Sequence, residues 1–225
     1  MRAASLPAAG ASHTTIGITD LMTSLAIVFI LLFAAQVTKT SSAAQSELQE
    51  NKEDVQTALR DHIQRLGLSL DADPRDPLAL AIVIPENLLT FEFGKSTLSP
   101  SADQFLGEAL PFYVAALCGP LRNKIDSLAI EGHTDDQGND AFNLKLSQER
   151  SLAVMVKGLE VIQAREPTAY QCFQEITSAT GRGRQDLIYD SPAVVNREQS
   201  RRVIFKIRLL SAEQRHHVER SAKAL

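Results

Sequence analysis

Residues 16–35 form an apolar run in which Asp20 is the only charged side chain, and this run constrains the chain more than any other feature. About 20 helical residues, at about 1.5 Å each, span the roughly 30 Å of a membrane's hydrocarbon core. The sequence therefore predicts a transmembrane helix over residues 16–37. Acids inside membranes are costly and usually face a bundle interior or an ion pathway, although one near the end of a span can simply mark the membrane edge.

A cleaved signal peptide is the alternative to a retained anchor. Signal sequences have an apolar core of about 7–15 residues behind a positively charged region. Here the run is longer, and Arg2 is the only Lys or Arg before it, which favours an anchor. Flanking charge specifies the orientation weakly, with Arg2 before the run and Lys39 after it. We place residues 1–15 in the cytoplasm and the chain beyond Lys39 in the periplasm, outside the inner membrane.

Residues 38–77 are expected to be a periplasmic linker that contains a helix. Small polar residues fill 38–46, and prolines 74 and 77 end the segment. Between them, apolar side chains recur at spacings of 7, 4, 4 and 3, at Leu48, Val55, Leu59, Ile63 and Leu66. So thin a helical stripe usually needs a partner, often a second copy in a coiled coil.

Residues 78–210 are predicted to form an α+β domain with a mixed sheet, followed by a tail at 211–225. Short apolar or alternating runs predict strands, and longer segments with helical periodicity predict helices. The expected strands are 78–84, 88–93, 125–131, 176–179 and 202–209, and the expected helices are 100–117 and 141–162. The net charge is −4 and there is no basic tail, so nucleic-acid binding has no electrostatic support.

Cys118 and Cys172 are the only two cysteines. Two cysteines in an oxidising compartment invite a disulfide, but two buried free thiols are an equal alternative. Both cysteines precede predicted strands that a right-handed crossover could set side by side. We therefore hypothesise that they are bonded.

A polar constellation follows the strand at 125–131. Asn143, Ser147 and Arg150 are separated by 4 and 3 residues, so they share one helical face, which can look back at the turn holding Thr134 and Asp135. A carboxylate and a guanidinium in one cleft suit a zwitterion, with Arg150 on its carboxylate and Asp135 on its ammonium. The alternative is a structural Asp135–Arg150 salt bridge that ties helix to turn.

His133 invites a metal-binding or general-base interpretation. No second His or Cys lies at ligand spacing, and no nucleophile motif is nearby. A hydrogen-bonded structural histidine is the better interpretation, and we expect neither a metal, nor a cofactor, nor enzymatic activity.

The motifs of the C-terminal part resemble the OmpA-like peptidoglycan-binding domain. They are Gly132-His133-Thr134-Asp135, Asn143, Leu146-Ser147, Arg150, Gly181, Gly183 and Arg201-Arg202-Val203. The resemblance implies binding of the diaminopimelate in the peptidoglycan stem peptide, with Asp135 and Arg150 as main ligands and Thr134, Asn143 and Arg201 in support. Two positions depart from the family pattern: Ser200 replaces an Asn, and Phe93-Gly94 replace a polar residue.

The apolar run also resembles the single transmembrane helix of stator B subunits, which include MotB of flagella and ZorB of Zorya anti-phage systems. The residues concerned are Asp20-Leu21-Met22-Thr23, Phe29 and Leu31-Leu32. The resemblance implies that Asp20 carries protons in an inner-membrane rotary motor, and that the chain pairs as a homodimer inside a ring of A-type subunits. A basic N-terminal tail and a proline-containing plug, usual in flagellar members, are missing, which favours a Zorya-type subunit. A flagellar stator and a passive wall anchor without ion transport remain alternatives.

Overall fold

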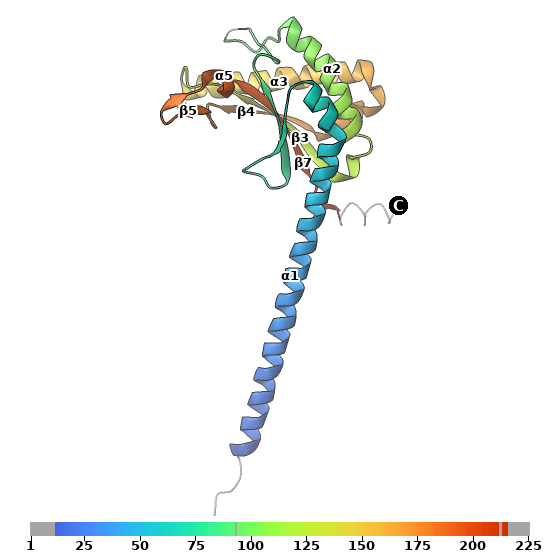
Figure 1. Ribbon diagram of the computed structural model, residues 1–225, viewed down its shortest axis with the longest axis vertical. Helices are drawn as coiled ribbons and strands as arrows, with labels where there is room; N and C mark the ends of the chain where they lie inside the picture. The colour runs from blue at the N-terminus through green and yellow to red at the C-terminus, as the bar shows by residue number, and fades with distance from the viewer. Residues whose placement is uncertain (1–11, 93, 212, 216–225) are drawn as a thin grey trace, which may run out of the picture. The chain divides into compact units, whose positions relative to one another are not determined.

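The computed structural model describes residues 12–92, 94–211 and 213–215, and for residues 12–20 it describes the backbone alone. The chain divides into two compact units, residues 1–47 and 48–225. Helix α1, Ser12–Arg65, begins in the first unit and ends in the second (Figure 1). It runs unbroken through the small polar residues 38–46. The hydroxyls of Thr38 and Thr40 bond back to carbonyls four residues earlier, so these side chains fit within the helix.

The first unit contains the apolar segment. From Leu21 to Val37 its large apolar side chains are all more than half exposed. Among the described residues, α1 is the one helix long and apolar enough to cross a membrane. Asp20 lies in this helix, and its side chain is outside what the structure describes.

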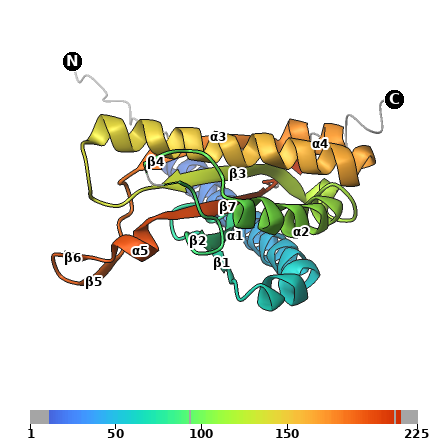
Figure 2. The same ribbon diagram turned by 90° about the horizontal axis from the view of Figure 1, so that it is seen from above.

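The second unit is built on a five-stranded mixed sheet with strand order β1-β2-β7-β3-β4 (Figure 2). The β3 and β4 strands are parallel and the other neighbours are antiparallel. The strands are β1 Leu70–Ala72, β2 Ala79–Pro85, β3 Ile125–His133, β4 Thr177–Gly183 and β7 Arg202–Leu209. A separate hairpin, β5 Tyr189–Ser191 with β6 Val194–Val195, precedes β7.

Two long helices pack beside each other on the sheet, with α3 along β3 and β4 (Figures 1 and 2). Ser99 begins α2 by accepting a hydrogen bond from the amide of Ala102, and Asn139 begins α3 by accepting one from Phe142. The helices are α2 Pro100–Leu117, α3 Asp140–Arg165, α4 Tyr170–Ile176 and α5 Arg197–Ser200, with short 3₁₀ turns at Arg122–Lys124 and Pro167–Ala169.

The apolar stripe of residues 48–66, which was expected to need a partner helix, packs into the core of the same compact unit. Val55, Leu59 and Ile63 are at most 2% exposed and belong to the same core cluster as Leu80 of β2 and Leu110 of α2. The compact unit therefore starts at Leu48. The coiled-coil expectation for this stripe is wrong, because these side chains are already buried by the domain.

The strand expected at 88–93 does not form among the described residues of that segment. The amides of Leu88 and Leu89 instead bond to the carbonyl of Pro85 in a turn, and only an isolated bridge joins Phe91 to Leu98. The apolar side chains of this loop pack against the core. The sequence of the loop therefore resembles that of a buried strand, although its backbone does not form one. The short β1 was not predicted, because only Leu70 of its three residues has an apolar side chain larger than Ala.

A disulfide joins Cys118, at the end of α2, to Cys172 in α4. Their Cα atoms are 5.9 Å apart, a usual separation for bonded cysteines. The bond fastens the short α4 to the far end of α2, next to the residues that lead into β3.

Candidate functional site

The candidate site lies where four chain segments meet at one edge of the sheet. Because β2 and β3 both run antiparallel to β7, the ends of β2 at Pro85 and β3 at His133 both lie opposite the first residue of β7, Arg202. The last residue of β4, Gly183, lies beside His133. The residues just beyond these strands are therefore brought together although they are far apart in sequence.

Asp135 sits in the turn after β3 and is 9% exposed. Its Oδ1 accepts a hydrogen bond from the amide of Gln137 at 3.0 Å. Its Oδ2 accepts one from Nη1 of Arg201 at 2.8 Å. Both carboxylate oxygens thus have partners, which hold this side chain in one orientation.

Asn143 and Ser147 fasten α3 to the turn and to β4. Asn143 is 2% exposed and donates from Nδ2 to the carbonyl of Gln137 at 2.7 Å. Ser147 is fully buried, and its Oγ accepts a hydrogen bond from the amide of Gly183 at 2.8 Å. The neighbouring Thr134 bonds through its amide to the carbonyl of Gly183, while its buried Oγ1 has no partner in the described part of the chain.

Arg150 comes from the same face of α3 and is 7% exposed. Its Nε donates to the carbonyl of Lys95 at 3.0 Å, and its guanidinium carbon lies 4.8 Å from the centroid of the Phe91 ring. Burial lowers the pKa of Arg150, an effect that the carboxylates of Glu86 and Asp135 oppose and the charge of Arg201 reinforces. Within the described residues, no carboxylate forms a salt bridge with Arg150.

The expected alternative, a structural Asp135–Arg150 salt bridge, is therefore not the arrangement in the described structure. Asp135 pairs instead with Arg201, which comes just before β7. Arg201 also donates from Nε to Oε2 of Glu86 at 2.5 Å. Burial alone would lower the pKa of Arg201, but its bonds to Glu86 and Asp135 outweigh that effect and raise it.

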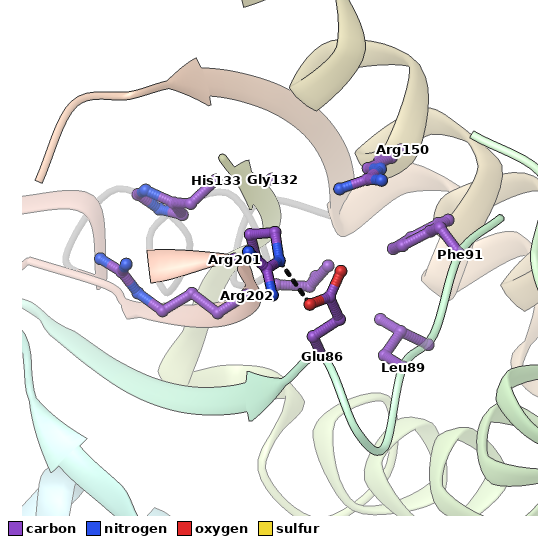
Figure 3. Close-up of a pocket in the computed structure, with 9 residues that line it drawn as sticks. Glu86, Leu89, Phe91, Gly132, His133, Arg150, Arg201 and Arg202 are labelled. Carbon is purple, nitrogen blue, oxygen red and sulfur yellow. Dashed lines mark hydrogen bonds and ion pairs between the residues drawn. The ribbon is translucent and has the colours of Figure 1, made fainter. Parts of the chain in front are cut away.

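A narrow pocket opens between these groups (Figure 3). Arg150 and Phe91 stand on one side of it, with Arg201 and Glu86 facing them. Arg150, Glu86 and Arg201 supply charge, and Leu89, Phe91 and Val203 supply apolar surface. The full lining is Glu86, Leu89, Phe91, Gly132, His133, Arg150, Arg201, Arg202 and Val203.

Three residues of this region have roles that sequence reasoning did not assign. Glu86 and Arg202 line the pocket, and Phe91 lies under Arg150. A signal for Glu86 was its place two residues after the apolar strand predicted at 78–84. Arg202 is held by carbonyls, including that of Asp186 at 2.9 Å, and has a structural role.

His133 is 2% exposed, and its Nδ1 lies 3.2 Å from the carbonyl oxygen of Gln185, in keeping with the structural interpretation. Its Nε2 is 3.9 Å from Oε2 of Glu131, beyond hydrogen-bond range. In the described part of the chain, no group of three or more His, Cys, Asp or Glu side chains is placed to hold a metal ion.

A helix-backed mixed sheet with a charged site at its strand ends defines a class of domain, and comparison with known proteins gives that class a name. Residues 90–201 match the OmpA family. The chain therefore carries an OmpA-like domain.

Individual relatives also match part of the chain. Outer membrane protein P5 of Haemophilus influenzae is 36% identical over 108 residues, which cover 44% of this chain and 28% of that protein. Outer membrane protein A of Bordetella avium is 28% identical over 144 residues, 63% of this chain and 66% of that protein. The chain thus spans only part of each of these relatives.

The fold has a counterpart among solved structures. A putative MotB-like protein from Desulfovibrio vulgaris superimposes with a TM-score of 0.53 at 24% identity, covering 74% of this chain and 96% of that one. This likeness establishes a shared fold for the domain.

Proposed function

We propose that the OmpA-like domain binds peptidoglycan by holding the zwitterionic end of diaminopimelate in its stem peptide. The observation that carries the proposal is Arg150, a buried guanidinium that faces a pocket and has no salt-bridge partner in the described structure. A buried charge normally needs a partner, so a ligand carboxylate would complete this site. The apolar side chains of Leu89, Phe91 and Val203 suit the methylene chain of the ligand.

Asp135 is the second main ligand in this proposal, and Arg201, Asn143 and Thr134 support the site. Asp135 offers negative charge to the ligand ammonium, and Arg201 keeps that carboxylate in place. Asn143 fixes the turn against α3, and the hydroxyl of Thr134, which has no partner among the described residues, is available to a polar group of the ligand.

Sacculus binding by the full chain in detergent tests this assignment. Arg150→Lys keeps the charge but loses the planar fork, and Asp135→Asn loses the charge but keeps the shape. Each variant should weaken the affinity for purified sacculi, measured by co-sedimentation, by about thirtyfold or more. This is the loss expected when a buried charged contact is broken. Arg60→Lys and Asp61→Asn, on an exposed part of α1, are the matched controls. Folded Arg150 and Asp135 variants that bind like wild type would refute the site.

The apolar part of α1 supports a second element of the proposal, an anchor in a bacterial inner membrane with the OmpA-like domain in the periplasm. We propose residues 1–15 as a cytoplasmic N-terminus, 16–37 as the span, 38–77 as a periplasmic segment whose part from Leu48 onward packs into the same compact unit as the domain, 78–210 as the wall-binding domain and 211–225 as a tail. In this arrangement one chain would join the membrane to the cell wall.

The finer proposal is that the chain is the B subunit of a proton-driven rotary motor, most specifically of a Zorya-type anti-phage system. It would act as a homodimer inside a ring of A-type subunits, with Asp20 as the proton carrier. Protonation would neutralise a charge in the membrane and so change which helix packing is favoured. The support is the sequence context of Asp20; a flagellar stator or a passive anchor would share the same periplasmic domain.

Asp20→Asn separates a motor from a passive anchor. Asn keeps the shape of Asp but cannot release a proton at neutral pH, so the variant should insert and assemble yet lose function. The measurement is phage protection or motility in a strain carrying the variant, whichever the neighbouring genes indicate. A strain with full activity would rule out the proton-carrier role.

A further inference from the structure

Glu86 is a pocket carboxylate to which the family motifs assign no role. It follows the last residue of β2, and its side chain is 26% exposed. One of its oxygens, Oε2, accepts the hydrogen bond from Arg201. The other, Oε1, has no hydrogen-bond partner in the part of the chain that the structure describes.

The two acids of the site differ in how many of their oxygens are free. Asp135 uses Oδ1 for the amide of Gln137 and Oδ2 for Arg201, and its side chain is 12% exposed. Glu86 uses one oxygen and lines the pocket directly. An uncommitted carboxylate oxygen is an acceptor only, and its best partner is a cationic donor.

The position of Glu86 relative to the two guanidinium groups sets which part of a ligand it can meet. Figure 3 shows its carboxylate between Arg201 and the side of the pocket formed by Arg150 and Phe91. Arg201 already has two carboxylate partners, Glu86 and Asp135, whereas Arg150 has none among the described residues. A bound carboxylate would therefore go to Arg150, and an ammonium group on the same carbon would lie on the acidic side.

We propose that Glu86 is a further ligand-binding residue, which accepts a hydrogen bond from the ammonium group of the zwitterion through Oε1, alongside Asp135. This inference rests on the proposed peptidoglycan-binding function and adds a specificity-determining residue to it. It makes recognition depend on a free amine next to the carboxylate that Arg150 binds.

The test crosses a protein substitution with a ligand substitution. One ligand is the synthetic tripeptide L-alanyl-γ-D-glutamyl-diaminopimelate, and the other carries 2-aminopimelate, which lacks the side-chain amine. Calorimetry measures the affinity of the full chain in detergent for each. Glu86→Gln should weaken binding of the amine-bearing tripeptide by about tenfold or more, the value of a hydrogen bond to a charged group. It should leave binding of the amine-free analogue nearly unchanged.

The same experiment distinguishes the other outcomes. Equal losses for both ligands would mean that Glu86 only positions Arg201, and no loss would mean that it is not involved; either result overturns this inference but leaves the proposed function intact. If the wild-type chain binds neither tripeptide, nor sacculi, the proposed function fails and this inference with it. Glu160→Gln, an exposed acid on α3, is the matched control, and thermal melting checks that each variant is folded.

Discussion

Nζ of Lys206 lies 2.7 Å from Oδ2 of Asp73, and this ion pair joins β7 in the middle of the sheet to the segment after the edge strand β1. Both side chains are largely buried, at 15% and 5% exposed. The same ammonium lies 3.3 Å from Oε1 of Glu131 on β3. One lysine thus neutralises two acids on neighbouring parts of the sheet.

Lys206→Met should destabilise the domain strongly. It retains the apolar stem but leaves Asp73 and Glu131 without their ammonium partner, and losing one side of a buried pair costs about 3–5 kcal/mol. The free energy of unfolding from urea titrations measures the effect. Lys145→Met, at a position 77% exposed, should change it by less than about 1 kcal/mol. Similar stabilities for the two variants would contradict the role given to Lys206.

The lowered pKa values of Asp73 and Glu131 predict that the domain loses stability at low pH. Burial alone would raise the pKa of Asp73, but the bonds from Lys206 and from the amide of Arg75 outweigh it and lower the pKa. The neighbouring His133 side chain lowers the pKa of Glu131 against the opposite effect of burial, with Lys206 adding to it. Because both folded-state values lie below the unfolded ones, this stabilisation is complete above the unfolded values, about 4. It is lost as the pH falls through the folded values.

Urea midpoints between pH 3 and pH 7 check this prediction. The wild-type midpoint should fall steeply below about pH 4.5, and the slope should be shallower in Lys206→Met, which lacks one cause of both shifts. Parallel curves for the two proteins would show that Lys206 does not govern the acid limb.

Gly132→Ala should disturb the packing of β3 on α3. A Cβ at Gly132 would collide with the backbone carbonyl oxygen of Ser147, which cannot move without shifting α3. Overpacking of this kind costs about 1–3 kcal/mol. The control is Gly107→Ala in α2. Its new Cβ would lie 3.7 Å from the side chain of Arg165, an ordinary contact, and the variant should gain stability from the higher helix propensity of Ala. Thermal melting compares the two variants with wild type. A Gly132→Ala variant that melts at the wild-type temperature would show that the close approach of β3 to α3 does not require glycine.

Loss of the Cys118–Cys172 bond should also lower stability. The cysteines are 54 residues apart in sequence, and the chain-entropy model assigns a loop of that length about 4 kcal/mol. Urea midpoints with and without reductant measure the loss, and the double Cys→Ser variant should be insensitive to reductant. Maleimide labelling gives an independent check, since complete labelling of both thiols in denatured, unreduced protein would exclude the bond.

Much of the fold follows from local sequence pattern, and the exceptions have physical causes. Helix α2 and strand β7 have the bounds that periodicity predicted, because turn residues and alternation mark them locally. A strand was wrongly predicted at 88–93 because a buried loop is as apolar as a buried strand. The stripe on α1 could be recognised, but the side chains it packs with in the core could not, since they come from segments further along the chain, including α2.

The candidate site shows the same division. Asn143, Ser147 and Arg150 lie on one buried helix face, as their spacing indicated. The partnership of Asp135 with Arg201 and the position of Glu86 depend on β7 lying between β2 and β3. That strand order is a property of the whole sheet, and no local pattern in the sequence encodes it.

The disulfide also determines what a protease can do to this domain. The residues between Cys118 and Cys172 include β3, the turn with Asp135, and all of α3 with Arg150. A single nick anywhere in that stretch opens the closed loop but leaves both pieces covalently joined. The site residues on either side of such a cut would stay in one covalently joined molecule. Only a second cleavage or reduction of the disulfide would release a fragment.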